Sequence, residues 1–143
     1  MRASIFAVSI LAMALVGCDQ AGNPNRADAV FRASNGFLVH PLGDGRFEVI
    51  PRGNSSSKGF FCAAGDYAQR RLGEPPSARV LLTSPAGPSV NNPGGRSAKF
   101  IVAPPGSGRS SGIFVNTRRA GESLTIGHAR TLCNRDFPGF NPD

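Results

Sequence analysis

The stretch GFFCAAGDYAQRRL, residues 59–72, decides how we expect this chain to fold. Its apolar residues recur at helical spacing, so one side of a helix would face a core. The members of that apolar face are Phe61, Ala64, Ala68 and Leu72. Gly73 and two prolines follow the stretch, which is a usual way for a helix to end. The sequence therefore predicts one helix over residues 59–72, with Asp66, Gln69 and Arg70 on its polar side.

Gly65 lies inside this predicted helix, where glycine costs about 1 kcal/mol relative to alanine, so we expect another element to approach closely there. The pattern aromatic-Cys-x-Ala-Gly-Asp-Tyr over residues 61–67 resembles one in small, functionally uncharacterised secreted proteins of Gram-negative bacteria. The resemblance covers about fifteen residues. It implies a helix pinned by a disulfide and transfers no activity. We expect Tyr67 to pack partly buried and Asp66 to satisfy nearby backbone or an arginine; the alternative is that the two form a ligand site.

Short apolar runs on both sides of the helix predict β-strands. Before it, the runs 37–40 and 47–50 flank Gly43-Asp44-Gly45, which predicts a β-hairpin. After it, we expect four strands separated by loops at 84–97 and 106–111. These four strands are 78–83, 98–102, 112–117 and 123–126.

The order of elements predicts a two-layer α+β domain, in which one helix packs on a mainly antiparallel sheet of short strands. The alternative is an all-β sandwich or barrel with the helix as a lid. The strands supply the candidate core residues Phe37, Val39, Phe47, Val49, Leu81, Phe100, Val102, Phe114, Leu124 and Ile126.

The first residues of the chain predict export. One positive charge at Arg2 precedes a run of about fourteen mostly apolar residues, roughly 21 Å as a helix, which is too short to span a core of about 30 Å. The segment Leu15-Val16-Gly17-Cys18 resembles the lipobox of bacterial lipoproteins. The resemblance implies cleavage before Cys18, lipids on its sulfur and attachment to a membrane. Asp19 resembles the signal that retains lipoproteins at the inner membrane in some Gram-negative groups, which favours that membrane over the outer one.

The expected organisation follows from these segments. Residues 1–17 form the signal peptide, and residues 18–34 are the lipidated cysteine and a flexible tether. Residues 35–133 form a single small domain, and residues 134–143 are an irregular tail. The protein is expected in the cell envelope of a Gram-negative bacterium, facing the periplasm.

With Cys18 assigned to lipid, Cys62 and Cys133 remain, and two thiols in an oxidising compartment usually pair. The bond would close a loop of about 70 residues, which corresponds to about 4 kcal/mol in the chain-entropy description. The alternative is a free nucleophilic thiol at Cys62, with His40 or His128 as its base.

The chain is basic, with 16 Lys and Arg against 9 Asp and Glu and a net charge of +7. In the envelope such a charge favours phospholipid head groups, lipopolysaccharide or peptidoglycan carboxylates as partners, rather than nucleic acid. Four arginines are candidates for an anion-binding patch: Arg109, Arg118, Arg119 and Arg130. The alternative is that these charges are solvated and serve solubility.

The sequence carries no pattern typical of a cofactor site, a metal site, a pair of catalytic carboxylates or a nucleophile elbow. It therefore predicts a lipid-anchored, non-enzymatic binding or structural module whose partner is an envelope protein or an anionic envelope component. Two alternatives stay open: an anionic glycan- or lipid-binding module acting through arginines, and a thiol-dependent envelope hydrolase.

Overall fold

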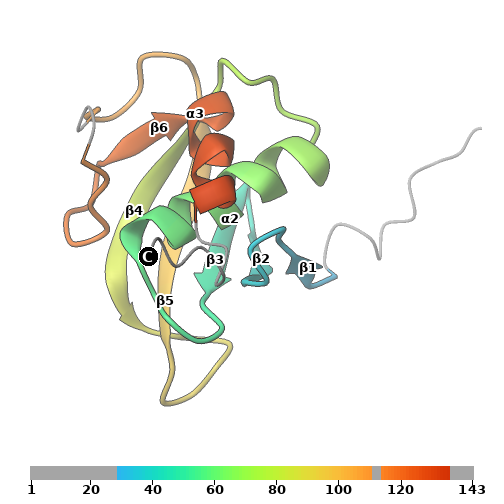
Figure 1. Cartoon of the computed structure of the whole chain (residues 1–143), viewed down its shortest axis with the longest axis vertical. Helices are drawn as coiled ribbons and strands as arrows, with labels where there is room; N and C mark the ends of the chain where they lie inside the picture. Colours follow the sequence, from blue (N-terminus) through green and yellow to red (C-terminus); the bar gives the residue numbers. More distant parts are fainter. Residues whose placement is uncertain (1–28, 111–113, 136–143) are drawn as a thin grey trace, which may run out of the picture.

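The computed structural model describes residues 29–110 and 114–135, which form strands, two α-helices and a short 3-10 helix (Figure 1). The predicted signal peptide, Cys18 and most of the predicted tether lie outside the described residues. In chain order the elements are β1 (Phe31–Arg32), β2 (Leu38–Gly43), β3 (Arg46–Ile50), α2 (Ser57–Arg70), β4 (Arg79–Pro88), β5 (Arg96–Ala103), β6 (Ser123–Thr125), α3 (Ile126–Thr131) and η1 (Leu132–Arg135).

All described strands belong to one sheet of six, in the order β1-β2-β3-β5-β4-β6, and every neighbouring pair is antiparallel. The sheet curls, and α2 and α3 pack against it (Figure 1). The predicted α+β class with a mainly antiparallel sheet is therefore confirmed. The curl also fits the alternative of a partly closed barrel with a helical lid.

The predicted hairpin is confirmed by the pairing of β2 with β3, in which Val39 lies opposite Val49. Its turn consists of Gly43, Asp44 and Gly45, with φ angles of 81°, 54° and 71°. Only residues that tolerate the left-handed region suit such a turn, which is why Gly-Asp-Gly predicted it.

Helix α2 begins and ends two residues earlier than the predicted range 59–72. Ser56 sets its start, because the Ser56 hydroxyl oxygen accepts a hydrogen bond from the Gly59 amide at 3.0 Å. Leu72 lies beyond the helix and is 38% exposed, so it does not belong to the buried face as predicted. Gly73, with a φ of 72°, then turns the chain away.

Most of α2 is buried on all sides, since every residue from Gly59 to Ala68 is buried. Phe61 packs edge-to-face on Phe100 of the sheet, with ring centroids 5.1 Å apart. Asp66, on the predicted polar side of the helix, is buried, because α3 and the segment that follows β1 meet α2 there. Arg70, one turn later, is exposed as predicted.

Helix α3 is an element that the sequence did not predict. The strand predicted at 123–126 ends at Thr125, whose hydroxyl oxygen accepts a hydrogen bond from the His128 amide and caps α3. Helix α3 packs against α2 at Gly65, where a Cβ would lie 2.7 Å from the Cβ of Ala129. The expected close approach at Gly65 is therefore confirmed, and α3 is the approaching element.

Three further boundaries differ from the prediction. The strand predicted at 112–117 is wrong for residues 114–117, which form no strand, and Phe114 is 82% exposed. The loop predicted at 84–97 is shorter, because β4 continues to Pro88 and β5 begins at Arg96. The fold also begins before the predicted domain boundary at residue 35, since β1 pairs with β2.

The core lies between α2 and the sheet. Val80 and Leu82 point into it from β4, so the predicted core residue Leu81 points to the other face and is only partly buried. Val102 packs at the core's edge. The predicted core residues that are buried are Phe37, Val39, Phe47, Val49, Phe100, Leu124 and Ile126.

Candidate functional site

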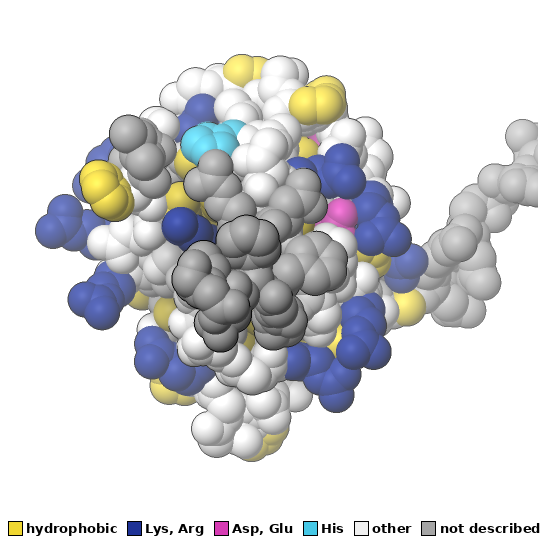
Figure 2. Space-filling model, in the orientation of Figure 1, with side chains coloured by type: hydrophobic (Ala, Val, Ile, Leu, Met, Phe, Trp, Pro, Cys, Tyr) yellow, Lys and Arg dark blue, Asp and Glu magenta, His cyan; other side chains and the backbone are white. Residues whose placement is uncertain are grey.

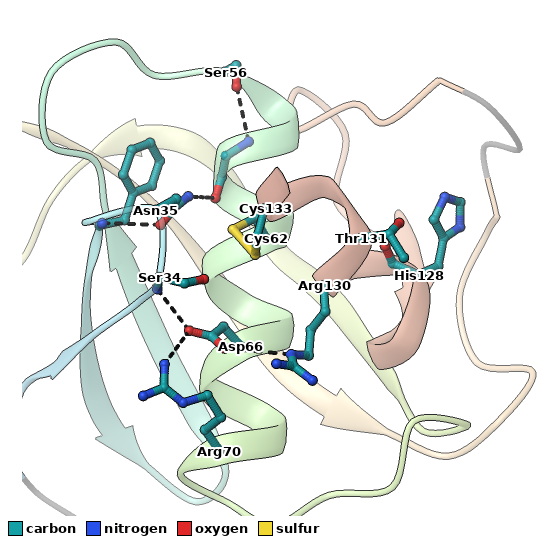
Figure 3. Close-up of a disulfide and its surroundings, with 12 residues drawn as sticks. Ser34, Asn35, Ser56, Cys62, Asp66, Arg70, His128, Arg130, Thr131 and Cys133 are labelled. Carbon is teal, nitrogen blue, oxygen red and sulfur yellow. Dashed lines mark hydrogen bonds and ion pairs between the residues drawn. A yellow bond between two sulfur atoms is a disulfide. The ribbon is translucent and has the colours of Figure 1, made fainter. Parts of the chain in front are cut away.

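The predicted disulfide between Cys62 and Cys133 is present and joins α2 to η1, with the two Cα atoms 4.9 Å apart (Figure 3). The Cys62 sulfur is part of this bond, so in this structure Cys62 has no free thiol that could act as a nucleophile. The two candidate bases lie on β2 and α3: His40 is paired in register with Glu48, and His128 is exposed.

Asp66 lies one helical turn after Cys62 and forms the centre of a polar cluster beside the disulfide (Figure 3). Its side chain is 2% exposed. Oδ2 accepts a hydrogen bond from the Ser34 amide at 2.9 Å and another from Arg70 Nη1 at 3.0 Å. Arg130 Nε lies 3.6 Å from Oδ1. Asp66 therefore ties together α2, α3 and the segment between β1 and β2, and its expected role of satisfying backbone and arginine is confirmed.

Two further contacts hold the arginines of this cluster in place. Arg70 lies over the Phe31 ring, 5.4 Å from its centroid. Arg130 Nη1 donates a hydrogen bond to Gln69 Oε1 at 2.5 Å. The side chains of Arg70 and Arg130 remain 52% and 42% exposed, so one buried carboxylate holds two cations at the surface.

A cavity of about 380 Å³ lies next to the cluster. Its lining consists of Ser34, Gly127, Arg130, Thr131 and Cys133, which come from three parts of the chain that Asp66 and the disulfide bring together. Sequence reasoning singled out Arg130 and Cys133. It missed Ser34, which lies in the predicted tether, and Thr131, which ends a helix that was not predicted.

The other candidate arginines lie in the loops that flank β6. Arg109 Nη2 donates a hydrogen bond to the Ala120 carbonyl at 2.6 Å, which brings Arg109 to the turn that carries Arg118 and Arg119. All three are exposed. Arg130 instead contacts α2, so a single patch that contains all four arginines stays a prediction.

Glu48 on β3 forms a second buried polar cluster, which sequence reasoning missed. Its side chain is fully buried, and it accepts hydrogen bonds from Ser97 Oγ at 2.5 Å, the Val90 amide at 2.8 Å and Asn91 Nδ2 at 2.6 Å. Burial by itself would raise the pKa of the Glu48 carboxyl, but these hydrogen bonds outweigh burial and lower the pKa from 4.5 to about 2. The donors to Glu48 lie 42 to 49 residues away in the sequence, so no local pattern identified them.

The surface formed by the described residues is basic. None of the thirteen Lys and Arg side chains whose burial the structure describes is buried, whereas three of the five Asp and Glu side chains in the described residues are. The buried acids are Glu48, Asp66 and Glu122. In Figure 2, Lys and Arg side chains are spread around the face, with little acidic surface between them.

The part of the chain that the structure describes contains no group of three or more His, Cys, Asp or Glu residues that could hold a metal ion. No helix within residues 29–110 or 114–135 is long and apolar enough to cross a membrane. Comparison of the chain with protein-family models, curated proteins and solved structures found no match.

Proposed function

We propose that this protein is a lipid-anchored, non-enzymatic module of the cell envelope that binds an anionic envelope component through its basic exterior. One observation carries the proposal: the fold buries most of its described acidic side chains and leaves its basic side chains in contact with water. The described positive charges thereby lie at the surface, where they can attract anionic lipids or glycans.

Two features support the envelope as the site of action. A disulfide bond persists in oxidising compartments such as the periplasm, and the one between Cys62 and Cys133 links distant parts of this chain. The segment Leu15-Val16-Gly17-Cys18 has the pattern of a lipobox, from which a lipid on Cys18 would follow. Attachment to the membrane raises the local concentration of the domain near anionic head groups, so a modest affinity suffices for binding.

A non-catalytic role fits the chemistry of the described residues. The strongest nucleophile candidate, Cys62, is buried in a disulfide, and the buried carboxylate of Glu48 has its oxygen atoms occupied by donors. Binding by arginines requires only accessible guanidinium groups, which this surface supplies.

The test is co-sedimentation of residues 18–143, carrying Cys18→Ser, with lipid vesicles and with purified peptidoglycan. This segment contains the whole described fold, and it lacks the lipid that would hold the protein on any membrane. We expect retention on phosphatidylglycerol vesicles or peptidoglycan at about 0.01 M salt, where the screening length is about 30 Å, and release at about 1 M, where it is about 3 Å.

Variants that change the surface charge in opposite directions test whether retention follows that charge. Arg118→Gln together with Arg119→Gln removes two exposed positive charges and is expected to weaken retention. Asp44→Asn removes an exposed negative charge and is expected to strengthen it. Equal retention on phosphatidylcholine vesicles, or retention that does not change with salt, would contradict the proposal and favour a protein partner.

A further inference from the structure

The cavity beside the disulfide is lined by a guanidinium group, that of Arg130, which two contacts hold in place. Arg130 Nη1 donates to Gln69, and Arg130 Nε lies against the buried carboxylate of Asp66. Arg130 itself belongs to the cavity lining, and the contacts of its guanidinium to Gln69 and Asp66 are made through Nη1 and Nε. A guanidinium that is already ordered loses less conformational entropy when it binds an anion.

The walls of the cavity are also held together. Cys133 is bonded to Cys62 of α2, and the Ser34 amide donates to Asp66, so both sides of the cavity are fixed to the same helix. In Figure 3 these groups lie along one side of α2, with Arg130 beside Asp66 and Thr131 beyond it on α3. Such a preformed cavity, at about 380 Å³, lies at the small end of the range for ligand sites.

The charges of the cluster match a single negative charge. Arg70 and Arg130 contribute two positive charges and Asp66 contributes one negative charge, so the cluster has a net charge of +1, and Arg130 is its member in the cavity lining. The hydroxyl group of Ser34 can add a neutral hydrogen bond to a ligand, whereas that of Thr131 already donates to the His128 carbonyl. A planar monoanion suits this arrangement better than a doubly charged phosphate, because the planar guanidinium matches a carboxylate.

We propose that this cavity binds a terminal carboxylate of a small ligand, such as the C-terminal end of a short peptide or an acidic sugar, through the Arg130 guanidinium. The inference rests on the proposed function, because it names a specific site and a ligand class within the general binding of anionic envelope components. Asp66 and Gln69 position the arginine, and the Ser34 hydroxyl completes the site.

The experiment is an NMR titration of residues 18–143 carrying Cys18→Ser, with N-acetyl-dialanine that has a free carboxylate as the probe. We expect saturable shifts of the Gly127, Thr131 and Cys133 amides, and no such shifts with the C-terminal amide of the same dipeptide. Arg130→Gln is expected to weaken binding at least about ten-fold, and Ser34→Ala a few-fold. Arg130→Lys should recover part of the affinity, whereas Arg52→Gln, which changes an exposed arginine outside the cavity lining, should bind as the unchanged chain does.

An intact disulfide by mass and an unchanged amide spectrum away from the cavity show that each variant is folded. Equal binding of the acid and the amide, unchanged binding by Arg130→Gln, or tighter binding of inorganic phosphate would each overturn the carboxylate site. Co-sedimentation with acidic vesicles, measured on the same samples, separates the two proposals. Loss of vesicle retention with intact dipeptide binding contradicts only the basic-exterior function, and the reverse result contradicts only the cavity.

Discussion

Two of the buried carboxylates, Asp66 on α2 and Glu48 on β3, are held in opposite ways. Asp66 is buried, but the two arginines that it pairs with are about half exposed, so their positive charges remain at the surface. Glu48 accepts its hydrogen bonds from the neutral groups of Val90, Asn91 and Ser97. A buried acid can therefore hold surface arginines in place, as Asp66 does, or fix a loop to the sheet, as Glu48 does.

The difference also determines what each acid contributes to stability. Removing Glu48 would leave the buried Ser97 hydroxyl and the part-buried donors of Val90 and Asn91 without this acceptor, and a buried donor left unpaired costs about 1 to 3 kcal/mol. Removing Asp66 would release Arg70 and Arg130 into water, where they are well solvated. We therefore assign Glu48 mainly to the fold and Asp66 mainly to the site.

The largest expected effect comes from breaking the bond between Cys62 and Cys133. The double variant Cys62→Ala, Cys133→Ala should lower the free energy of unfolding by about 4 kcal/mol, measured by urea denaturation. Hydrogen exchange should speed up first in α3 and η1, while the amides of Val90 and Asn91 stay protected because Glu48 still holds them. Uniform loss of protection across both regions would show that the two clusters do not behave separately.

Glu48→Gln is expected to cost about 3 kcal/mol of stability, because an amide has only one acceptor oxygen and places its own donors against those of the loop. Glu74→Gln changes a partly exposed acid and serves as the control, with a change of less than about 0.5 kcal/mol. Urea midpoints measure both variants. A similar small change for both would refute the structural role of Glu48.

The pH dependence of stability tests the structural role of Glu48 in a second way. The pKa of Glu48 is about 2 in the fold and 4.5 as its ordinary value, so the charged form is favoured by folding. Its contribution, up to about 3 kcal/mol, is fully present above pH 4.5 and is lost as the pH falls towards 2. Glu48→Gln should flatten the stability curve in that window; an unchanged slope would show that another group titrates there.

The smallest expected effect is that of Asp66→Asn, at about 1 kcal/mol, because the asparagine oxygen can still accept from the Ser34 amide. The variant should lose order at Arg130, seen as averaging of its side-chain NMR signals, since the carboxylate no longer holds the guanidinium. A larger loss of stability than that of Glu48→Gln would reverse the proposed division of roles.

Local sequence signals predicted the features that depend on residues with special backbone or bonding properties. Gly43-Asp44-Gly45 predicted the hairpin turn, because few other residues tolerate its backbone. Gly65 predicted a close helix contact, although not the element that makes it. The pairing of Cys62 with Cys133 followed from assigning Cys18 to lipid, and the two cysteines do form the bond.

The errors came from segments whose structure depends on distant partners. Pro85 and Pro88 looked like strand breakers, but β4 continues past Pro85 and ends only at Pro88, through irregular pairing with β5. The apolar residues 114–117 looked like a strand, yet Thr117 instead bonds to Ser57 at the start of α2. Helix α3 is only six residues long and contains a glycine, so its local signal is weak.

The candidate site was predictable only in part, for the same reason. Arg130 was a binding candidate because it belongs to a group of arginines that lie not far apart in the sequence. An arginine was also one of the two expected kinds of partner for Asp66, and Arg130 is such a partner. The hydrogen bond from Ser34 spans 32 residues of sequence, and the donors to Glu48 lie 42 to 49 residues away from it. No local pattern encodes such contacts.

The most direct test of the central claim is the salt dependence of binding to acidic vesicles by residues 18–143 carrying Cys18→Ser. A basic exterior predicts strong retention at low salt that falls steadily as salt rises, together with little retention on neutral vesicles. Retention that is absent at low salt on both vesicles and peptidoglycan, or that is unaffected by salt, would contradict binding through surface arginines.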